Sequence, residues 1–187
     1  MKRLTIGLDI DGVIVDFTTA ALPLLSEVCN RPVSPGDLSH YDLKECLGID
    51  EKTDDYFWKR VLGTDFMLNA PPVSGALDGM SALCLHELRL VTGRPPAMRD
   101  ITERWLEKQD VKYDSLIFTA TGSKASQGSD CDIFVEDFLE EVQRIAESGV
   151  FTLLFNQPWN QALRLPENCR RVYDWEDIVA IVRDLSE

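Results

Sequence analysis

The chain has 187 residues, of which 44% are hydrophobic and 27% charged, and its formal net charge is −13. This length and composition are typical of one soluble globular domain, or of one domain with a modest insertion. So negative a chain is a poor candidate for binding nucleic-acid polymers or anionic membranes, which require basic patches. A phosphorylated small molecule would need a local cation at its binding site, because the surface as a whole repels it.

The five cysteines are scattered and form no CxxC pair. This favours free thiols in a reducing compartment and argues against a zinc site. The apolar run in the first ten residues is interrupted by Asp9 and lacks the length and cleavage region of a signal peptide. No apolar run approaches the roughly 20 residues of a membrane span. We therefore expect a cytoplasmic protein without a membrane partner; a homodimer is compatible with the sequence, which does not fix the oligomeric state.

Short apolar runs bounded by turn residues predict five strands: Leu4–Leu8, Leu88–Val91, Ser115–Thr119, Ile133–Val135 and Phe151–Phe155. Apolar residues at helical spacing predict helices over Met98–Lys108, Leu139–Glu147 and Trp175–Leu185. Strands that are apolar throughout indicate a sheet covered on both faces. Their alternation with helices predicts a doubly wound parallel α/β sheet, a Rossmann-type core, whose ligands bind beyond the carboxyl ends of the strands.

The segment between the first two predicted strands is much longer than a crossover requires. It contains three predicted helices, Phe17–Cys29, Asp54–Leu62 and Ala76–Leu85. We interpret residues 16–71 as a small helical cap inserted after the first strand. Residues 1–15 and 72–187 would then form the catalytic core.

Asp9 and Asp11 follow the first predicted strand, in the stretch LDIDG. Side chains two residues apart on a strand share one side, so both carboxylates could point into one crevice. Two like charges so close together either share a proton or bind a cation. Mg²⁺ takes oxygen ligands and keeps positions for water and phosphate oxygens. The alternative is a solvated turn, because Asp-Gly is a common turn dipeptide.

Two later segments carry groups suited to phosphate. After the second strand, in VTGRP, Thr92 offers a hydroxyl, Gly93 an accessible backbone N–H, and Arg94 additional charge. Farther along, Lys124 would be a mobile cation on the loop TGSKASQGSD. The alternatives are an ordinary strand exit for the first and a solvated loop lysine for the second.

Glu136 and Asp137 end the fourth predicted strand, in FVEDF. With Asp9 and Asp11 they would place four carboxylates at neighbouring strand ends, an arrangement that is strongly repulsive without a cation. An acidic start of the following helix, favoured by the helix dipole, is the alternative. A helix start of this kind accounts for one acidic residue more readily than for two adjacent ones.

The order Asp-x-Asp-Gly, Thr, Lys, Glu-Asp resembles that of the haloacid dehalogenase-like hydrolases. The resemblance implies that Asp9 attacks phosphorus and forms an aspartyl phosphate. It implies that Asp11 protonates the leaving oxygen and later deprotonates water. Thr92, Gly93 and Lys124 would bind the phosphoryl oxygens. The implied ligands of Mg²⁺ are Asp9, the backbone carbonyl of Asp11, Glu136 and Asp137.

Two further segments, Leu68–Met80 and Pro158–Ile178, resemble those of the 5′(3′)-deoxyribonucleotidases. This resemblance implies a Mg²⁺-dependent phosphomonoesterase acting on nucleoside 5′- or 3′-monophosphates, in particular the deoxy forms. Animal members have Thr-Ser-Pro where this chain has Thr92-Gly93-Arg94-Pro95, and Asp-Asp where it has Glu136-Asp137. The sequence alone leaves open a phosphatase of sugar phosphates or other small phosphomonoesters, or a catalytically silent binding protein.

Base recognition would require aromatic side chains from the cap or its rim. We expect Phe17 and Phe66 to line the substrate pocket, whereas Phe57 and Trp58 would pack the interior of the cap. The two histidines, His40 and His86, are expected to be surface or packing residues.

Overall fold

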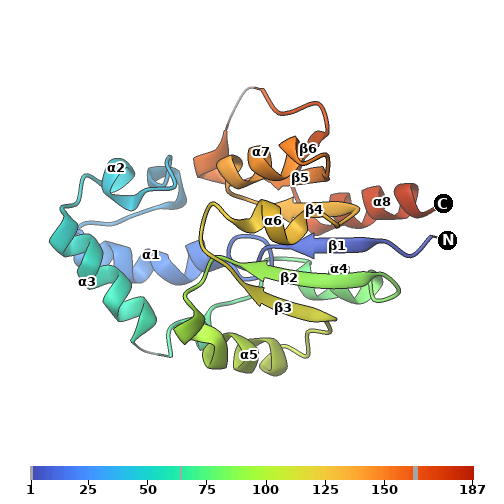
Figure 1. Ribbon diagram of the computed structural model, residues 1–187. Helices are drawn as coiled ribbons and strands as arrows, with labels where there is room; N and C mark the ends of the chain where they lie inside the picture. Colours follow the sequence, from blue (N-terminus) through green and yellow to red (C-terminus); the bar gives the residue numbers. More distant parts are fainter. Residues whose placement is uncertain (1, 64, 162–163) are drawn as a thin grey trace.

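The computed structural model describes residues 2–63, 65–161 and 164–187. At its centre is a six-stranded sheet whose neighbouring strands all pair in parallel, in the order β3-β2-β1-β4-β5-β6 (Figure 1). The strands are β1 (Thr5–Leu8), β2 (Glu87–Thr92), β3 (Ser115–Phe118), β4 (Ile133–Glu136), β5 (Phe151–Phe155) and β6 (Cys169–Val172). The prediction of a doubly wound parallel sheet is confirmed. Its strand order reverses at β1, where a crevice opens beyond the carboxyl ends of the strands.

The helices are α1 (Phe17–Val28), α2 (Leu43–Leu47), α3 (Glu51–Leu62), α4 (Ala76–Ala82), α5 (Arg99–Lys108), α6 (Lys124–Gly128), α7 (Leu139–Glu147) and α8 (Trp175–Ser186). Apolar residues on both faces of the sheet are buried, as the continuous apolar strands predicted. Trp105 of α5 and Trp175 of α8 belong to the larger hydrophobic cluster. Ile145 of α7 packs with Phe134 and Val91 in a second cluster.

Helices α2 and α6, of five residues each, were not predicted, and three further elements differ from the prediction. Strand β6 was missed because it lies at the edge of the sheet and is only partly apolar, with Arg170 exposed. Helix α3 begins at Glu51, three residues before the predicted start, because the Asp50 side chain accepts a hydrogen bond from the Thr53 N–H and caps it. Helix α4 ends at Ala82, where the Leu83 N–H turns towards the carbonyls of Gly79 and Met80.

The inserted helices α1, α2 and α3 lie beyond the carboxyl ends of the strands (Figure 1). The chain enters and leaves this segment at adjacent points. The Asp16 N–H donates to the Pro71 carbonyl at 2.9 Å, and the Val73 N–H donates to the Ile14 carbonyl at 2.8 Å. None of the helices within the described ranges has both the length and the apolar character needed to cross a membrane.

Candidate active site

The polar residues predicted from the strand ends meet at one place, because β1 lies between β2 and β4 in the sheet. Asp9 follows β1, Thr92 ends β2, Glu136 ends β4, and Asp137 follows it. All four side chains are buried. Parallel strands bring their carboxyl ends to the same edge, so chain segments far apart in sequence supply one cluster of groups.

Lys124 lies inside this cluster. Its Nζ is 2.7 Å from Asp9 Oδ1 and 2.6 Å from Glu136 Oε2. The prediction of a mobile loop cation is wrong: Lys124 begins helix α6 and is buried. Burial opposes its charged form, but the two carboxylates outweigh this and raise the pKa of Lys124 well above its usual value. Lys124 is therefore a fixed positive charge between two carboxylates.

Negative charge still exceeds positive charge around Asp9. Burial, and then the charge of Glu136, raise the pKa of Asp9 to about 8. The same two causes raise the pKa of Asp137 well above its ordinary value. Carboxylate oxygens of Asp9, Glu136 and Asp137 all lie within 4.8 Å of one another. A buried set of oxygen donors with excess negative charge suits a hard divalent cation.

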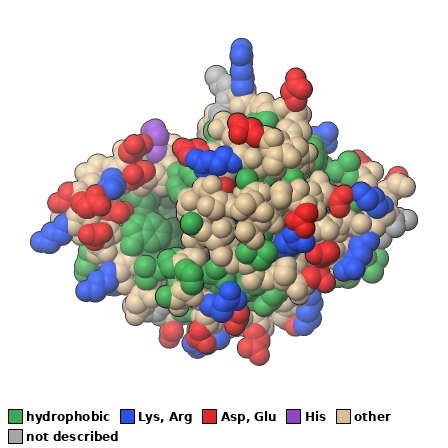
Figure 2. Space-filling view, viewed as in Figure 1, with side chains coloured by type: hydrophobic (Ala, Val, Ile, Leu, Met, Phe, Trp, Pro, Cys, Tyr) green, Lys and Arg blue, Asp and Glu red, His purple; other side chains and the backbone are tan. Residues whose placement is uncertain are grey.

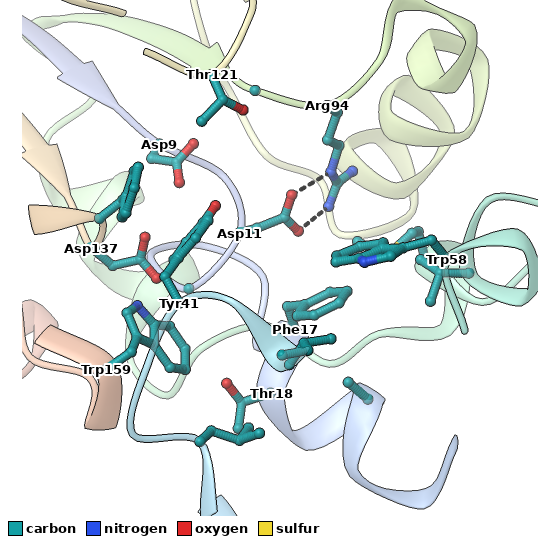
Figure 3. Close-up of a pocket in the computed structure, with 18 of the residues that line it drawn as sticks. Asp9, Asp11, Phe17, Thr18, Tyr41, Trp58, Arg94, Thr121, Asp137 and Trp159 are labelled. Carbon is teal, nitrogen blue, oxygen red and sulfur yellow. Dashed lines mark hydrogen bonds and ion pairs between the residues drawn. The ribbon is translucent and has the colours of Figure 1, made fainter. Parts of the chain in front are cut away.

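Asp11 does not join this cluster. Its carboxylate forms a two-pronged ion pair with Arg94, whose Nε is 2.7 Å from Oδ2 and whose Nη2 is 2.6 Å from Oδ1 (Figure 3). The predicted role of Arg94, to add charge at the phosphate, is thus not what the structure shows. The four carboxylates form two groups, with Lys124 beside one and Arg94 beside the other.

The turn after β2 is fixed by Thr92. Its Oγ1 accepts a hydrogen bond from the Arg94 N–H at 3.1 Å, and its side chain is buried. A hydroxyl that accepts in this way still has its own proton to donate. Gly93 lines the adjacent cavity. Both residues therefore remain available for phosphate binding, which stays a prediction.

Gly12 allows the loop after β1 to approach the carboxylates closely. Its φ is +83°, a conformation that favours glycine, and an added Cβ would lie 1.9 Å from Asp137 Oδ2. The Gln157 side chain donates to the Gly12 carbonyl at 2.8 Å. Buried Asn160 donates to the carbonyls of Asp137 and Phe155, both at 2.7 Å. The loop after β5 thus fixes the backbone at both acidic motifs.

A cavity of about 420 Å³ opens above these groups, between the inserted helices and the core. Figure 2 shows hydrophobic side chains gathered at this junction. On one wall Phe17 stacks against Trp58, with ring centroids 5.8 Å apart and planes 9° apart (Figure 3). On another, Tyr41 stacks against Phe138 at 4.0 Å. The cavity is therefore largely apolar, with carboxylates on its floor.

The aromatic predictions were partly misplaced. Phe17 lines the cavity as expected, but Phe66 is not among its lining residues and packs edge-on against Phe17 at 6.2 Å. Trp58, expected in the cap interior, lines the cavity instead. Helical spacing explains this difference: Phe57 is fully buried, and its neighbour Trp58 projects to a different side of α3.

Tyr41 is a site residue that sequence reasoning missed, because it lies between predicted helices without a motif. Its ring stands in the cavity beside Asp9, Asp11 and Asp137 (Figure 3). Partial burial in the cavity and then the charge of Asp137 raise the pKa of Tyr41 above its ordinary value, although 53% of the residue is exposed. The two histidines were expected to be surface or packing residues. His40 is exposed and also lines the cavity, whereas His86 is buried and accepts a hydrogen bond from the Leu4 N–H.

Comparison with known proteins agrees with this geometry. A model of the family described as 5′ nucleotidase, deoxy (Pyrimidine), cytosolic type C protein matches residues 3–185. The YqfW protein of Bacillus subtilis, provisionally named a nucleotidase, is 31% identical over 185 residues, covering 94% of this chain and 92% of its own.

Solved structures with low sequence identity show the fold. A haloacid dehalogenase-like hydrolase of Streptococcus pneumoniae superposes with a TM-score of 0.70 at 12% identity, covering 96% of this chain and 98% of its own. The YfnB hydrolase of Bacillus subtilis, whose structure is bound to magnesium, gives a TM-score of 0.61 at 15% identity, covering 97% and 99%.

The fold is that of the haloacid dehalogenase-like hydrolases. Within that class, the chain belongs to the family of cytosolic type C 5′-deoxynucleotidases, and it is a phosphomonoester hydrolase.

The raised pKa of Asp9 predicts how pH changes stability without metal. In the unfolded chain Asp9 ionises near 3.8, and in the folded protein near 8. Between these values the folded state binds more protons, so the contribution of Asp9 to stability falls as pH rises from about 4 to 8. We expect Asp9→Asn to be progressively more stable than the wild type across this window. Urea unfolding in EDTA measures the difference, and a gap that does not change with pH would contradict the prediction.

Proposed function

We propose that this protein is a Mg²⁺-dependent phosphatase of nucleoside 5′- and 3′-monophosphates, in particular the deoxyribonucleotides, and that it works through an aspartyl-phosphate intermediate. The observation that carries the proposal is the position of buried Asp9. It lies beside Lys124 on the floor of an aromatic cavity. Membership of a family of cytosolic deoxynucleotidases supports the substrate class and a cytoplasmic location.

In the first half-reaction, a carboxylate oxygen of Asp9 forms a bond to phosphorus, and the bond from phosphorus to the ester oxygen breaks. The carboxyl proton of Asp11 goes to the departing oxygen, which leaves as the nucleoside hydroxyl. Lys124, Thr92 and the Gly93 N–H bind the phosphoryl oxygens. Preorganised donors of this kind stabilise the charge that develops in the transition state.

In the second half-reaction, the Asp11 carboxylate takes a proton from water. The water oxygen bonds to phosphorus as the bond to Asp9 breaks, and inorganic phosphate leaves. Asp9 is again a carboxylate and Asp11 again holds a proton. Asp9 is thus the nucleophile throughout, and Asp11 is the acid and then the base. Their surroundings differ accordingly: Asp9 is buried beside Lys124, and Asp11 is partly exposed beside Arg94.

The chemistry of the donor set supports a cation ligated by Asp9, Asp137 and the backbone carbonyl of Asp11. Glu136 is already engaged: Oε2 accepts from Lys124, and Oε1 accepts from the backbone N–H groups of Asp137 and Phe138. We therefore assign Asp137 as the direct ligand and Glu136 as the residue that fixes its backbone. When bound, Mg²⁺ would neutralise charge on the phosphoryl group. The magnesium in the related YfnB structure also supports this choice.

We propose that residues 16–71 act as the cap that selects the substrate. The core groups recognise phosphate and metal only, whereas Phe17 and Trp58 offer flat apolar surfaces to a nucleobase. Phe66 supports Phe17 from behind. The apolar walls also exclude water, which strengthens the electrostatic interactions on the floor.

Asp9→Asn should abolish turnover and leave the fold intact, because an amide matches the shape of the carboxylate but cannot attack phosphorus. Asp11→Asn should reduce turnover by about 10²- to 10⁴-fold, the usual contribution of acid–base help. Both are measured as phosphate release from a panel of ribo- and deoxyribonucleotides and sugar phosphates with Mg²⁺. Asp184→Asn, on the exposed side of α8, is the control. Substantial turnover by pure Asp9→Asn would exclude Asp9 as the nucleophile.

EDTA should silence the enzyme and Mg²⁺ should restore it, whereas Ca²⁺ should support little activity because its coordination is looser. Mg²⁺ should also raise the melting temperature, since it binds the folded state alone. This shift should disappear in Asp137→Asn, which loses a carboxylate ligand. It should persist in Asp11→Asn, because residue 11 would bind the cation through its backbone carbonyl, which the substitution keeps. Full activity in the chelated protein would contradict the cation assignment.

Phe17→Ala and Trp58→Ala should each lower kcat/KM for nucleotides about 5- to 150-fold, the equivalent of losing roughly 1–3 kcal/mol of stacking. Hydrolysis of p-nitrophenyl phosphate, which needs less of the cavity, should change little. Phe66→Ala should have a smaller effect, because Phe66 acts through Phe17. Tyr56→Ala, an exposed aromatic on α3 that does not line the cavity, is the matched control. Equal losses on both substrates would mean that these rings only pack the cap.

A further inference from the structure

Arg94 is one of the most firmly held side chains of the site. Only 4% of its side chain is exposed, and its guanidinium bonds to both oxygens of Asp11. Its Nη1 donates to the Thr102 hydroxyl of α5 at 2.9 Å, and Thr102 is fully buried. Its backbone N–H is bound by the Thr92 hydroxyl. Side chain and backbone are thus fixed from three elements of the core.

Asp11 is held differently from Asp9. It lies on the loop after β1, and 31% of its side chain is exposed, on the floor of the cavity. Lys124 lines the same cavity, and the proposed cation site lies on its floor, so a loop carboxylate could turn towards either positive charge. In either position the Asp11 carboxylate would bind the positive charge and could no longer act as an acid or base at the ester oxygen. The pair with Arg94 opposes that rotation.

We propose that Arg94 is the positioning residue of the acid–base group, holding the Asp11 carboxylate on the side of the cavity where the leaving oxygen departs. This inference rests on the proposed role of Asp11. Each carboxylate oxygen has two lone pairs, so an oxygen that accepts from Arg94 keeps another lone pair for the substrate side. A guanidinium suits this task because its rigid fork matches a carboxylate in two places.

The pair must also allow Asp11 to carry a proton. A protonated oxygen is a donor, so one of the two contacts with Arg94 opens while Asp11 holds the proton, and the other remains. Thr102 keeps the guanidinium in place meanwhile, because its hydroxyl accepts from Nη1, a nitrogen that does not contact Asp11. When the proton passes to the leaving oxygen, both contacts can form again.

The test is a double-mutant cycle with Arg94→Met, Asp11→Asn and the combined variant. A deoxyribonucleoside 5′-monophosphate is compared with p-nitrophenyl phosphate, whose leaving group needs no proton. Because kcat/KM covers the steps up to the covalent intermediate, it isolates protonation of the leaving group. We expect Arg94→Met to lower kcat/KM for the nucleotide about 10- to 100-fold through misplacement of Asp11. The aryl phosphate should lose less than about threefold, and the combined variant should be no worse than Asp11→Asn.

Two variants separate positioning from folding. Arg94→Lys keeps the charge but contacts one oxygen at a time, so its nucleotide activity should lie between the wild type and Arg94→Met. Arg89→Met is the matched control. Arg89 lies on β2, outside the cavity lining, and pairs with Asp130 at 2.6 Å and with Glu87 at 3.1 Å, so its loss should leave both activities unchanged. Thermal melts with Mg²⁺ show whether each variant folds and binds the ion.

Two results would overturn the inference. Equal losses on the two substrates that multiply with the Asp11→Asn loss, or a raised KM alone, would make Arg94 a phosphate ligand. Unchanged nucleotide activity in Arg94→Met would leave it with a structural role only. Neither result bears on the proposed function, which stands or falls with the activity of Asp9→Asn.

Discussion

The site depends on the compensation of buried negative charge. Carboxylates at neighbouring strand ends repel one another strongly in a low-dielectric crevice, and the cost of burying them is offset only by opposite charge and hydrogen bonds. Lys124 lies between Asp9 and Glu136, and Arg94 pairs with Asp11. Asp137 adds a further carboxylate to the buried oxygen cluster. The electrostatic balance of the site thus favours a divalent cation.

The two ion pairs involve residues at which this chain differs from the animal deoxyribonucleotidases that it resembles. The change after β2 supplies Arg94, and the change at the end of β4 supplies Glu136. Glutamate, one methylene longer than aspartate, reaches Lys124 with one oxygen and the backbone N–H groups of Asp137 and Phe138 with the other. Both departures therefore stand in direct contact with proposed catalytic groups and not at the periphery of the site.

The core and the inserted helices contribute different physical properties. The sheet fixes charged groups to within hydrogen-bonding distance, and the loop after β5 secures the backbone around them through Asn160 and Gln157. The inserted helices add apolar rings above this floor. Under the proposed function, phosphate recognition requires fixed charge and recognition of a flat base requires apolar surface. The core would supply the first and the inserted helices the second.

The sequence by itself determined the parallel sheet and the meeting of Asp9, Thr92, Glu136 and Asp137, because apolar strands and their carboxyl ends are local patterns whose spatial consequence is general. It could not determine the partners of the charged groups. Whether Arg94 contacts phosphate or Asp11, and whether Lys124 is mobile or buried, depends on how α5 and α6 pack against the sheet. The same holds for the exchange of Phe66 for Trp58 on the cavity wall. Side-chain pairing across distant segments is a property of packing, and only the tertiary structure decides it.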